Sequence, residues 1–305
     1  MKWLSSPPAR CFVVCFCLLV GIATGSRGVK VVQAASDTGN AALVQTSVFL
    51  PFVSTASPTV NVTSADSYDN NSDRDKDDDD QDDDDQDDDN NSANYNPKID
   101  PQDFVSAVTN PYFTLTPGAV WTYEGVNSEG APAKDVVEVT QDTKTILGVT
   151  TIVVRDRAWE DGALVEDTLD WYAQDNKGNV WYFGEQTDNY ENGKIVNHEG
   201  SWEAGVDGAK PGIIMEANPR VGDKYRQEYL KGQAEDQAKV LSTTASVKTK
   251  FGNFTNCVET RDWTRLEPGI VEHKYYCKEV GNLAFEKSVA GESDQLELVD
   301  MQMKK

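Results

Sequence analysis

The longest regular pattern in the chain is the alternation of hydrophobic and polar residues that is typical of β-strands. It is clearest at residues 164–185, where two runs rich in Trp, Tyr and Val flank a cluster of turn-forming residues at 175–179. Asn and Gly tolerate positive φ, whereas Trp, Tyr and Val favour the half-buried surface of a pleated sheet. The stretch therefore predicts a β-hairpin. A similar pattern returns at residues 270–287.

Strand patterns fill most of the chain after residue 112. Asp161-Gly162 and Asn192-Gly193 are two-residue turn signals between such patterns. A segment rich in Gly and Pro, at 205–222, interrupts them, and strands resume at Tyr225 and continue to about residue 303. The pattern predicts an all-β fold of antiparallel strands.

One short helix is predicted before the first strand, at residues 101–108. Asp100 is a suitable N-cap and Pro101 suits the first helical position. Phe104, Val105 and Val108 would form the apolar stripe of this helix.

The two halves of the strand-rich region resemble each other. Trp171-Tyr172 matches Tyr275-Tyr276 at an offset of 104, and five such anchor points fall in order at offsets of 103–106. We predict a duplicated antiparallel β-meander, with repeats at about 112–204 and 216–303. Two such units would form either an open curved sheet or a barrel-like domain, with a concave face lined by alternate residues.

The second half contains two cysteines that fit a cross-strand disulfide. If the hairpin turn is centred on Glu267, residues whose numbers sum to 534 face each other, and Cys257 and Cys277 satisfy this sum. Cross-strand neighbours have Cβ atoms ~5 Å apart, near the separation that a disulfide requires. The same register predicts two further pairs, Arg261 with His273 and Glu259 with Tyr275.

The first 35 residues have the features of a secretory signal peptide. Lys2 and Arg10 precede a hydrophobic run at 11–22, and small residues follow up to Ala35. The alternative is a retained membrane anchor, but the run is short against the ~20 residues that span a bilayer. We predict a protein that is secreted or held at the cell surface, with no transmembrane segment after cleavage.

Residues 36–95 predict a disordered linker with a strongly acidic tract at 73–89. The tract holds thirteen Asp against Arg74 and Lys76, which gives 2 − 13 = −11 of the net charge of −23. Such a tract is a self-repelling spacer, and it can also load Ca²⁺ weakly because hard cations prefer carboxylate oxygens. No other cofactor is predicted. The weak Ca²⁺ ligands would be Asp77, Asp78, Asp79, Asp80, Asp82, Asp83, Asp84, Asp85, Asp87, Asp88 and Asp89.

The overall acidity argues against nucleic acid as a partner, because phosphates would be repelled. The chain has two histidines, His198 and His273, and no GxSxG motif, so a zinc enzyme and a serine hydrolase of that type are disfavoured. We predict a non-catalytic protein and keep a carboxylate-based hydrolase as the alternative.

The candidate site residues lie where charged and aromatic residues alternate along the predicted strands. Arg155 or Arg157 is expected to meet Glu166 or Asp170 on the concave face, as a ligand-orienting or structural ion pair. The predicted ligand-facing or ion-pair cluster is Arg155, Arg157, Glu166, Asp170, Tyr172, Arg261 and His273. The many aromatic residues around the sheet are expected to be core rather than a ligand platform.

Two blocks resemble a bacterial envelope family related to the lipoprotein-carrier half-barrels. They are Gly252-Asn253-Phe254 with its following strand, and the stretch at 275–283, which is similar to the pattern "GxF … wYapgvGlV". The resemblance covers roughly 110–290 and implies a curved antiparallel sheet with a hydrophobic concavity. It implies no established reaction. Cys277 and Lys278-Glu279 depart from the small residue and Pro-Gly of the pattern, so its turn geometry need not apply here.

These observations favour binding of a small apolar or amphipathic ligand, or of an envelope or matrix partner, in the concavity. The second hypothesis is a Ca²⁺-responsive surface or matrix protein that acts through the Asp-rich tract.

Overall fold

The computed structural model describes residues 95–304. The predicted signal peptide and almost all of the predicted linker, including the Asp-rich tract, lie outside these residues and stay predictions. The described chain is nearly all β-strand, as the alternation of hydrophobic and polar residues predicted. Its elements are η2 (Pro101–Asp103), β1 (Phe104–Val105), β2 (Val108–Asn110), β3 (Phe113–Leu115), β4 (Ala119–Val126), β5 (Pro132–Ile146), β6 (Val149–Glu160), β7 (Ala163–Asp175), β8 (Val180–Glu191), β9 (Lys194–Asn197), β10 (Trp202–Glu203), β11 (Lys210–Met215), β12 (Lys224–Arg226), β13 (Glu228–Tyr229), β14 (Gln237–Lys248), β15 (Asn253–Trp263), β16 (Val271–Cys277), β17 (Asn282–Ala290) and β18 (Gln295–Met303).

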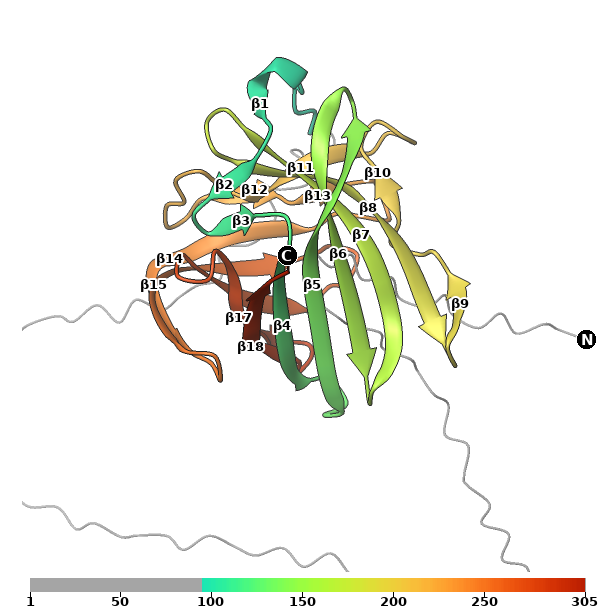
Figure 1. Cartoon of the computed structure of the whole chain (residues 1–305), viewed down its shortest axis with the longest axis vertical. Coiled ribbons are helices and arrows are strands. Elements are labelled where there is room, and N and C mark those ends of the chain that lie inside the picture. The colour runs from blue at the N-terminus through green and yellow to red at the C-terminus, as the bar shows by residue number, and fades with distance from the viewer. Residues whose placement is uncertain (1–94, 305) are drawn as a thin grey trace, which may run out of the picture. The chain divides into compact units, whose positions relative to one another are not determined.

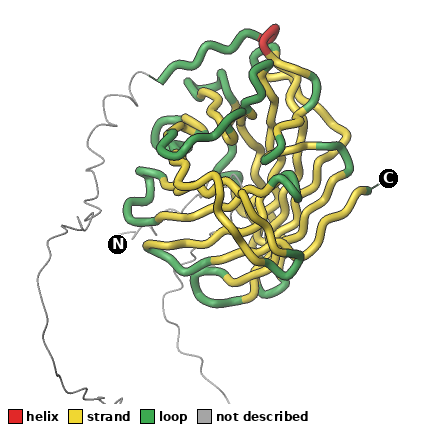
Figure 2. The backbone as a smooth tube through the Cα atoms, turned by 90° about the vertical axis from the view of Figure 1, so that its left-hand side faces the viewer, coloured by secondary structure: helices red, strands yellow, loops and turns green. Residues whose placement is uncertain are grey.

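One antiparallel sheet curves into a barrel-like shape (Figure 1). Its strand order is β12-β14-β15-β16-β17-β18-β4-β5-β6-β7-β8-β11-β13. Because β12 and β13 follow each other directly in the chain, the two ends of this order meet. Figure 2 shows the curved sheet from the side, and buried hydrophobic side chains fill its interior. Both halves of the chain are therefore antiparallel meanders in a single sheet. Whether they arose by duplication stays a prediction.

The two meanders join where the last strand, β18, pairs with β4. The pairing runs from Gln295 opposite Val126 to Met303 opposite Ala119. Gly125 is required at this seam, because a Cβ on it would overlap the carbonyl oxygen of Gln295.

The interior changes from apolar to polar along the strands. The β2–β3 hairpin covers the apolar end, where the Phe113 ring lies 5.2 Å from Tyr172 and 6.4 Å from Tyr276. Trp121 fills the same region and donates a hydrogen bond from Nε1 to the carbonyl of Val280 at 3.0 Å. At the other end, inward-facing positions of the same strands carry carboxyl groups, among them Asp135.

The predicted N-terminal helix is wrong in its extent. A single 3₁₀ turn forms over Pro101–Asp103, and the Asp100 side chain accepts a hydrogen bond from the Gln102 backbone as the N-cap prediction required. Phe104 and Val105 then form a strand that pairs with Asp175 and Gln174 of β7. These two residues pair with an available sheet edge and do not form the apolar stripe of a helix.

The predicted disulfide between Cys257 and Cys277 is confirmed, with Cα atoms 4.4 Å apart. Its hairpin has the predicted register, in which Arg261 faces His273 and Glu259 faces Tyr275. The turn at Gly269 adopts a φ of 96°, a conformation that glycine accepts without strain.

Candidate functional site

The polar end of the barrel interior holds a cluster of carboxyl groups. Asp135, Asp156, Asp170 and Glu185 are between 2% and 9% exposed, and Glu166 lies beside them on the inner face of β7. The Tyr182 hydroxyl donates to Asp170 at 2.7 Å. Four neighbouring strands, β5 to β8, contribute these groups. We call this set the inner carboxyl cluster.

Burial is the main cause of altered acidity in the inner carboxyl cluster. Burial raises the pKa of Asp135 to about 7, although a hydrogen bond with Asp156 acts in the opposite direction. Burial, helped by the nearby Asp156 charge, raises the pKa of Glu166 to about 7. The pKa values of Asp156, Asp170 and Glu185 are also raised by burial and then by neighbouring carboxylates. These groups therefore retain protons near neutral pH.

The predicted pairing of Arg155 or Arg157 with the inner acids does not form. Both arginines lie on the opposite, outer face of β6, because side chains alternate along a strand. Arg155 pairs with Asp167, with a hydrogen bond from Nε to Oδ1 at 2.7 Å. Arg157 lies 3.8 Å from Glu138. The sequence placed Glu166 and Asp170 together on one face, but it was wrong to place Arg155 or Arg157 on that face with them.

The other predicted site residues also separate. Tyr172 is a core residue, 1% exposed and stacked on Tyr182 with centroids 4.9 Å apart. His273 contacts the Glu259 carboxylate through Nδ1 at 2.9 Å, and Arg261 lies over the Trp263 ring at 4.8 Å. The predicted cluster is therefore divided among the interior, the outer face of β6 and the outer face of β15–β16.

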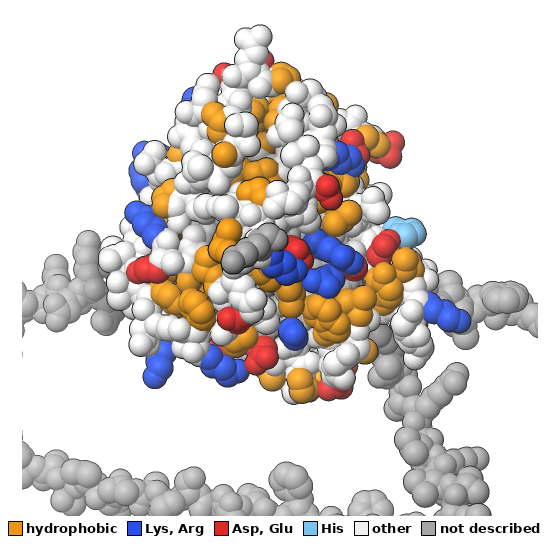
Figure 3. Space-filling model, viewed as in Figure 1, with side chains coloured by type: hydrophobic (Ala, Val, Ile, Leu, Met, Phe, Trp, Pro, Cys, Tyr) orange, Lys and Arg blue, Asp and Glu red, His pale blue; other side chains and the backbone are white. Residues whose placement is uncertain are grey.

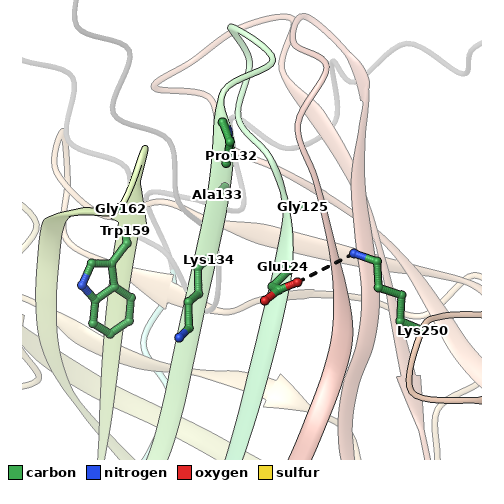
Figure 4. Close-up of a pocket in the computed structure, with 8 residues that line it drawn as sticks. All are labelled: Glu124, Gly125, Pro132, Ala133, Lys134, Trp159, Gly162 and Lys250. Atoms are coloured by element: carbon green, nitrogen blue, oxygen red, sulfur yellow. Dashed lines mark ion pairs between the residues drawn. The ribbon is translucent and has the colours of Figure 1, made fainter.

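A pocket of about 540 Å³ lies on the outer face of β4, β5 and β6. Figure 4 shows Trp159, Lys134 and Glu124 side by side on the three strands, with Lys250 reaching toward Glu124 from the β14–β15 turn. The Lys250 ammonium group lies 3.8 Å from Glu124 and 3.3 Å from Glu297. The remaining lining residues are small or apolar: Gly125, Pro132, Ala133 and Gly162.

Trp159 provides the ring of this pocket, and cations lie beside it. Lys134 Nζ and the Arg157 guanidinium are each 5.5 Å from the ring centroid. Lys134 is exposed and makes no ion pair with any residue in the described range. Lys and Arg side chains gather near the middle of the face that carries β4 to β7, flanked by hydrophobic side chains (Figure 3). The pocket therefore combines an aromatic surface with an unneutralised positive charge.

The sequence identified Glu166 and Asp170 of the inner carboxyl cluster, but it missed the other three members, as well as Lys134 and Lys250 of the pocket. Asp135 could have been recognised, because Ala133, Val137 and Val139 share its face of β5 and are core residues. Lys250 could not have been recognised from the sequence. It lies 126 positions (250 − 124) after Glu124, and only the folded β14–β15 hairpin brings the two side chains together.

Within residues 95–304, no three His, Cys, Asp or Glu side chains are arranged to hold a metal ion. The same residues include no helix with the length and hydropathy needed to cross a membrane. The Asp residues predicted to load Ca²⁺ lie outside this range, so that hypothesis stays a prediction.

No protein-family model and no curated protein matches the chain. Among solved structures it is similar to a "putative exported protein with YmcC-like fold" from Bacteroides fragilis. The identity is 16% and the TM-score 0.37, over 62% of this chain and 98% of that one. It is also similar to a "putative lipoprotein" from Parabacteroides distasonis, with 13% identity and a TM-score of 0.35, over 63% of this chain and 98% of that one.

Proposed function

We propose that the protein is a non-catalytic binding protein, secreted or held at the cell surface, that takes an amphipathic anion in the Trp159 pocket. The apolar part of the ligand would lie on the Trp159 ring, and its acidic group would face Lys134 and Lys250. An aromatic ring with adjacent cations suits a ligand that has one apolar part and one charged part.

The observation that carries this proposal is the position of Lys134. Its ammonium group lies beside the Trp159 ring, exposed and without a carboxylate partner among residues 95–304. An incoming anion would not have to displace an existing ion pair at this lysine. Lys250, by contrast, is held by Glu124 and Glu297, so it is positioned in advance.

The inner concavity is less suitable for the ligand than the sequence suggested. Its apolar end is filled by side chains that are at most 1% exposed, including Tyr172, Tyr182 and Phe113. Its polar end is packed with carboxyl groups that would repel an anion. We therefore place the amphipathic ligand on the outer face rather than between the two meanders.

The proposal is tested by titrating the secreted protein with anilinonaphthalene sulfonate, a fluorescent amphipathic anion. Lys134→Gln should weaken binding by roughly fivefold, because loss of one exposed charge contact is worth about 1 kcal/mol. Trp159→Ala should abolish the fluorescence of the bound probe. Lys177→Gln, at an exposed lysine in the β7–β8 turn, is the matched control and should bind normally. Equal affinities for the wild type and Lys134→Gln would contradict the proposal.

A further inference from the structure

Five basic residues lie in a row across the outer face of the second meander. The strand registers pair Lys224 with Lys239, Lys239 with Arg261, Arg261 with His273 and His273 with Lys287. Each pair is directly opposite, so the row crosses β12, β14, β15, β16 and β17 at right angles to the strands. Neighbouring strands are ~4.8 Å apart, so the row is roughly 19 Å long. We call it the basic row.

The basic row faces away from the interior. The residues next to it on β14 and β15, such as Ala238 and Asp262, are 0% and 4% exposed and point inward. Side chains alternate along a strand, so Lys239 and Arg261 point to the outside. Lys239 is accordingly exposed, and Arg261 and Lys287 are partly exposed.

The charges of the basic row are mostly not neutralised by the protein. Lys239, Arg261 and Lys287 make no ion pair with any described residue, whereas His273 contacts Glu259 at 2.9 Å. The Trp263 ring lies beside two members of the row, since Lys224 Nζ is 5.0 Å and the Arg261 guanidinium 4.8 Å from its centroid.

The basic row by itself lowers the stability of the folded protein. Like charges directly opposite on neighbouring strands repel each other, and Lys239 faces both Lys224 and Arg261 in this way. The domain as a whole carries no excess of positive charge that would account for the row. Residues 1–94 hold 6 basic and 16 acidic residues, so residues 95–305 hold 28 − 6 = 22 and 51 − 16 = 35, a net charge of −13.

We propose that the basic row is a binding site for a linear acidic polysaccharide, which lies across the strands with successive carboxylates facing successive basic residues. The row supplies evenly spaced cations along a straight line, the pattern that complements a polymer with repeated charges. Next to the row, on the same outer face, the Tyr275 and Phe285 rings lie 5.8 Å apart and offer apolar surface to sugar rings. The acidic domain disfavours polymers of higher charge density, such as nucleic acid.

The experiment measures binding of the full-length secreted chain to a polyuronate oligomer of defined length by calorimetry, at several salt concentrations. The test variant is Lys239→Gln/Arg261→Gln/Lys287→Gln. Its matched control is Lys98→Gln/Lys177→Gln/Lys194→Gln, which removes the same charge from exposed positions outside the row. Neutral dextran and single-stranded DNA of equal total charge are the comparison ligands.

We expect the wild type and the control to bind the polyuronate with an affinity that falls as salt rises, and not to bind dextran. The row variant should lose about tenfold or more in affinity, with a smaller salt dependence, because fewer counterions are released. Its melting temperature should be unchanged or higher, since repulsion is removed. Trp159→Ala should bind the polyuronate normally, which separates this site from the Trp159 pocket.

Four outcomes would overturn the proposal. The first is no binding above that of dextran. The second is an equal loss of affinity in the row and control variants. The third is tighter binding of the DNA than of the polyuronate, which would assign the row to another polymer. If binding appeared only after the Asp residues at 73–89 were changed to Asn, the occupant of the row would be that tract and not a polysaccharide.

Discussion

Asp135 and Asp156 lie close enough inside the barrel for each carboxyl group to shift the pKa of the other. They come from neighbouring strands, β5 and β6, and are 2% and 9% exposed. Two buried carboxylates this close do not both stay ionised, so the pair holds a proton. The inner carboxyl cluster extends this arrangement across four strands.

The domain is expected to be more stable in mild acid than in base. The raised pKa values of Asp135 and Glu166, about 7 against about 4 in the unfolded chain, mean that the folded state binds more protons between these limits. The unfolding free energy should therefore fall as pH rises from about 4 to above 7, by about 1.4 kcal/mol per pH unit for each retained proton. Urea denaturation at pH 5 and pH 8 checks this, and equal stability at both would contradict it.

Asp135→Asn should reduce this pH dependence. The amide keeps the shape of the protonated acid and carries no charge, so the variant should be more stable than the wild type at pH 8 and similar at pH 5. Asp167→Asn is the control, because it removes the outer partner of Arg155 and should cost about 1 kcal/mol or less at either pH. Denaturant midpoints at the two pH values distinguish the variants.

Removing the disulfide should destabilise the second meander. Cys257→Ala/Cys277→Ala opens a ring closed at a sequence separation of 20, which corresponds to about 3 kcal/mol in the chain-entropy model. Thermal unfolding of the wild type with and without a reductant provides the parallel measurement. A melting temperature unaffected by both changes would show that the hairpin register alone holds these strands.

Gly125→Ala should disrupt the seam between the two meanders. The added methyl group would overlap the Gln295 carbonyl, and neither backbone can move without breaking the β4–β18 ladder. We expect a loss of more than about 2 kcal/mol in unfolding free energy. Gly162→Ala, where nothing lies within 4 Å of the new Cβ, should cost about 1 kcal/mol through its positive φ alone. Similar losses in the two variants would contradict the role of the seam.

The sequence predicted those features that depend on residues close together in the chain. Strand periodicity and the turn around Glu267 were sufficient to give the disulfide and the register of its hairpin, because two strands joined by a short turn have few ways to pair. The helix prediction at 101–108 failed because its apolar residues had a sheet edge available, which no local pattern reveals.

The candidate sites depend on contacts that local patterns do not contain. The basic row combines residues spread over 63 positions (287 − 224), and it is visible only when four strand registers are known together. The sequence did predict one of these links, between Arg261 and His273. Glu166 and Asp170 were placed together on one face, but the apolar neighbours that make that face the interior come from other strands.

The seam between β18 and β4 also has a kinetic consequence. Met303 pairs with Ala119, a separation of 303 − 119 = 184 residues, so the ring of strands closes only after the final strand has been synthesised. Contacts this distant in sequence form slowly, because the intervening chain must first be ordered. During synthesis the β4 edge of the first meander would stay unpaired until β18 is available.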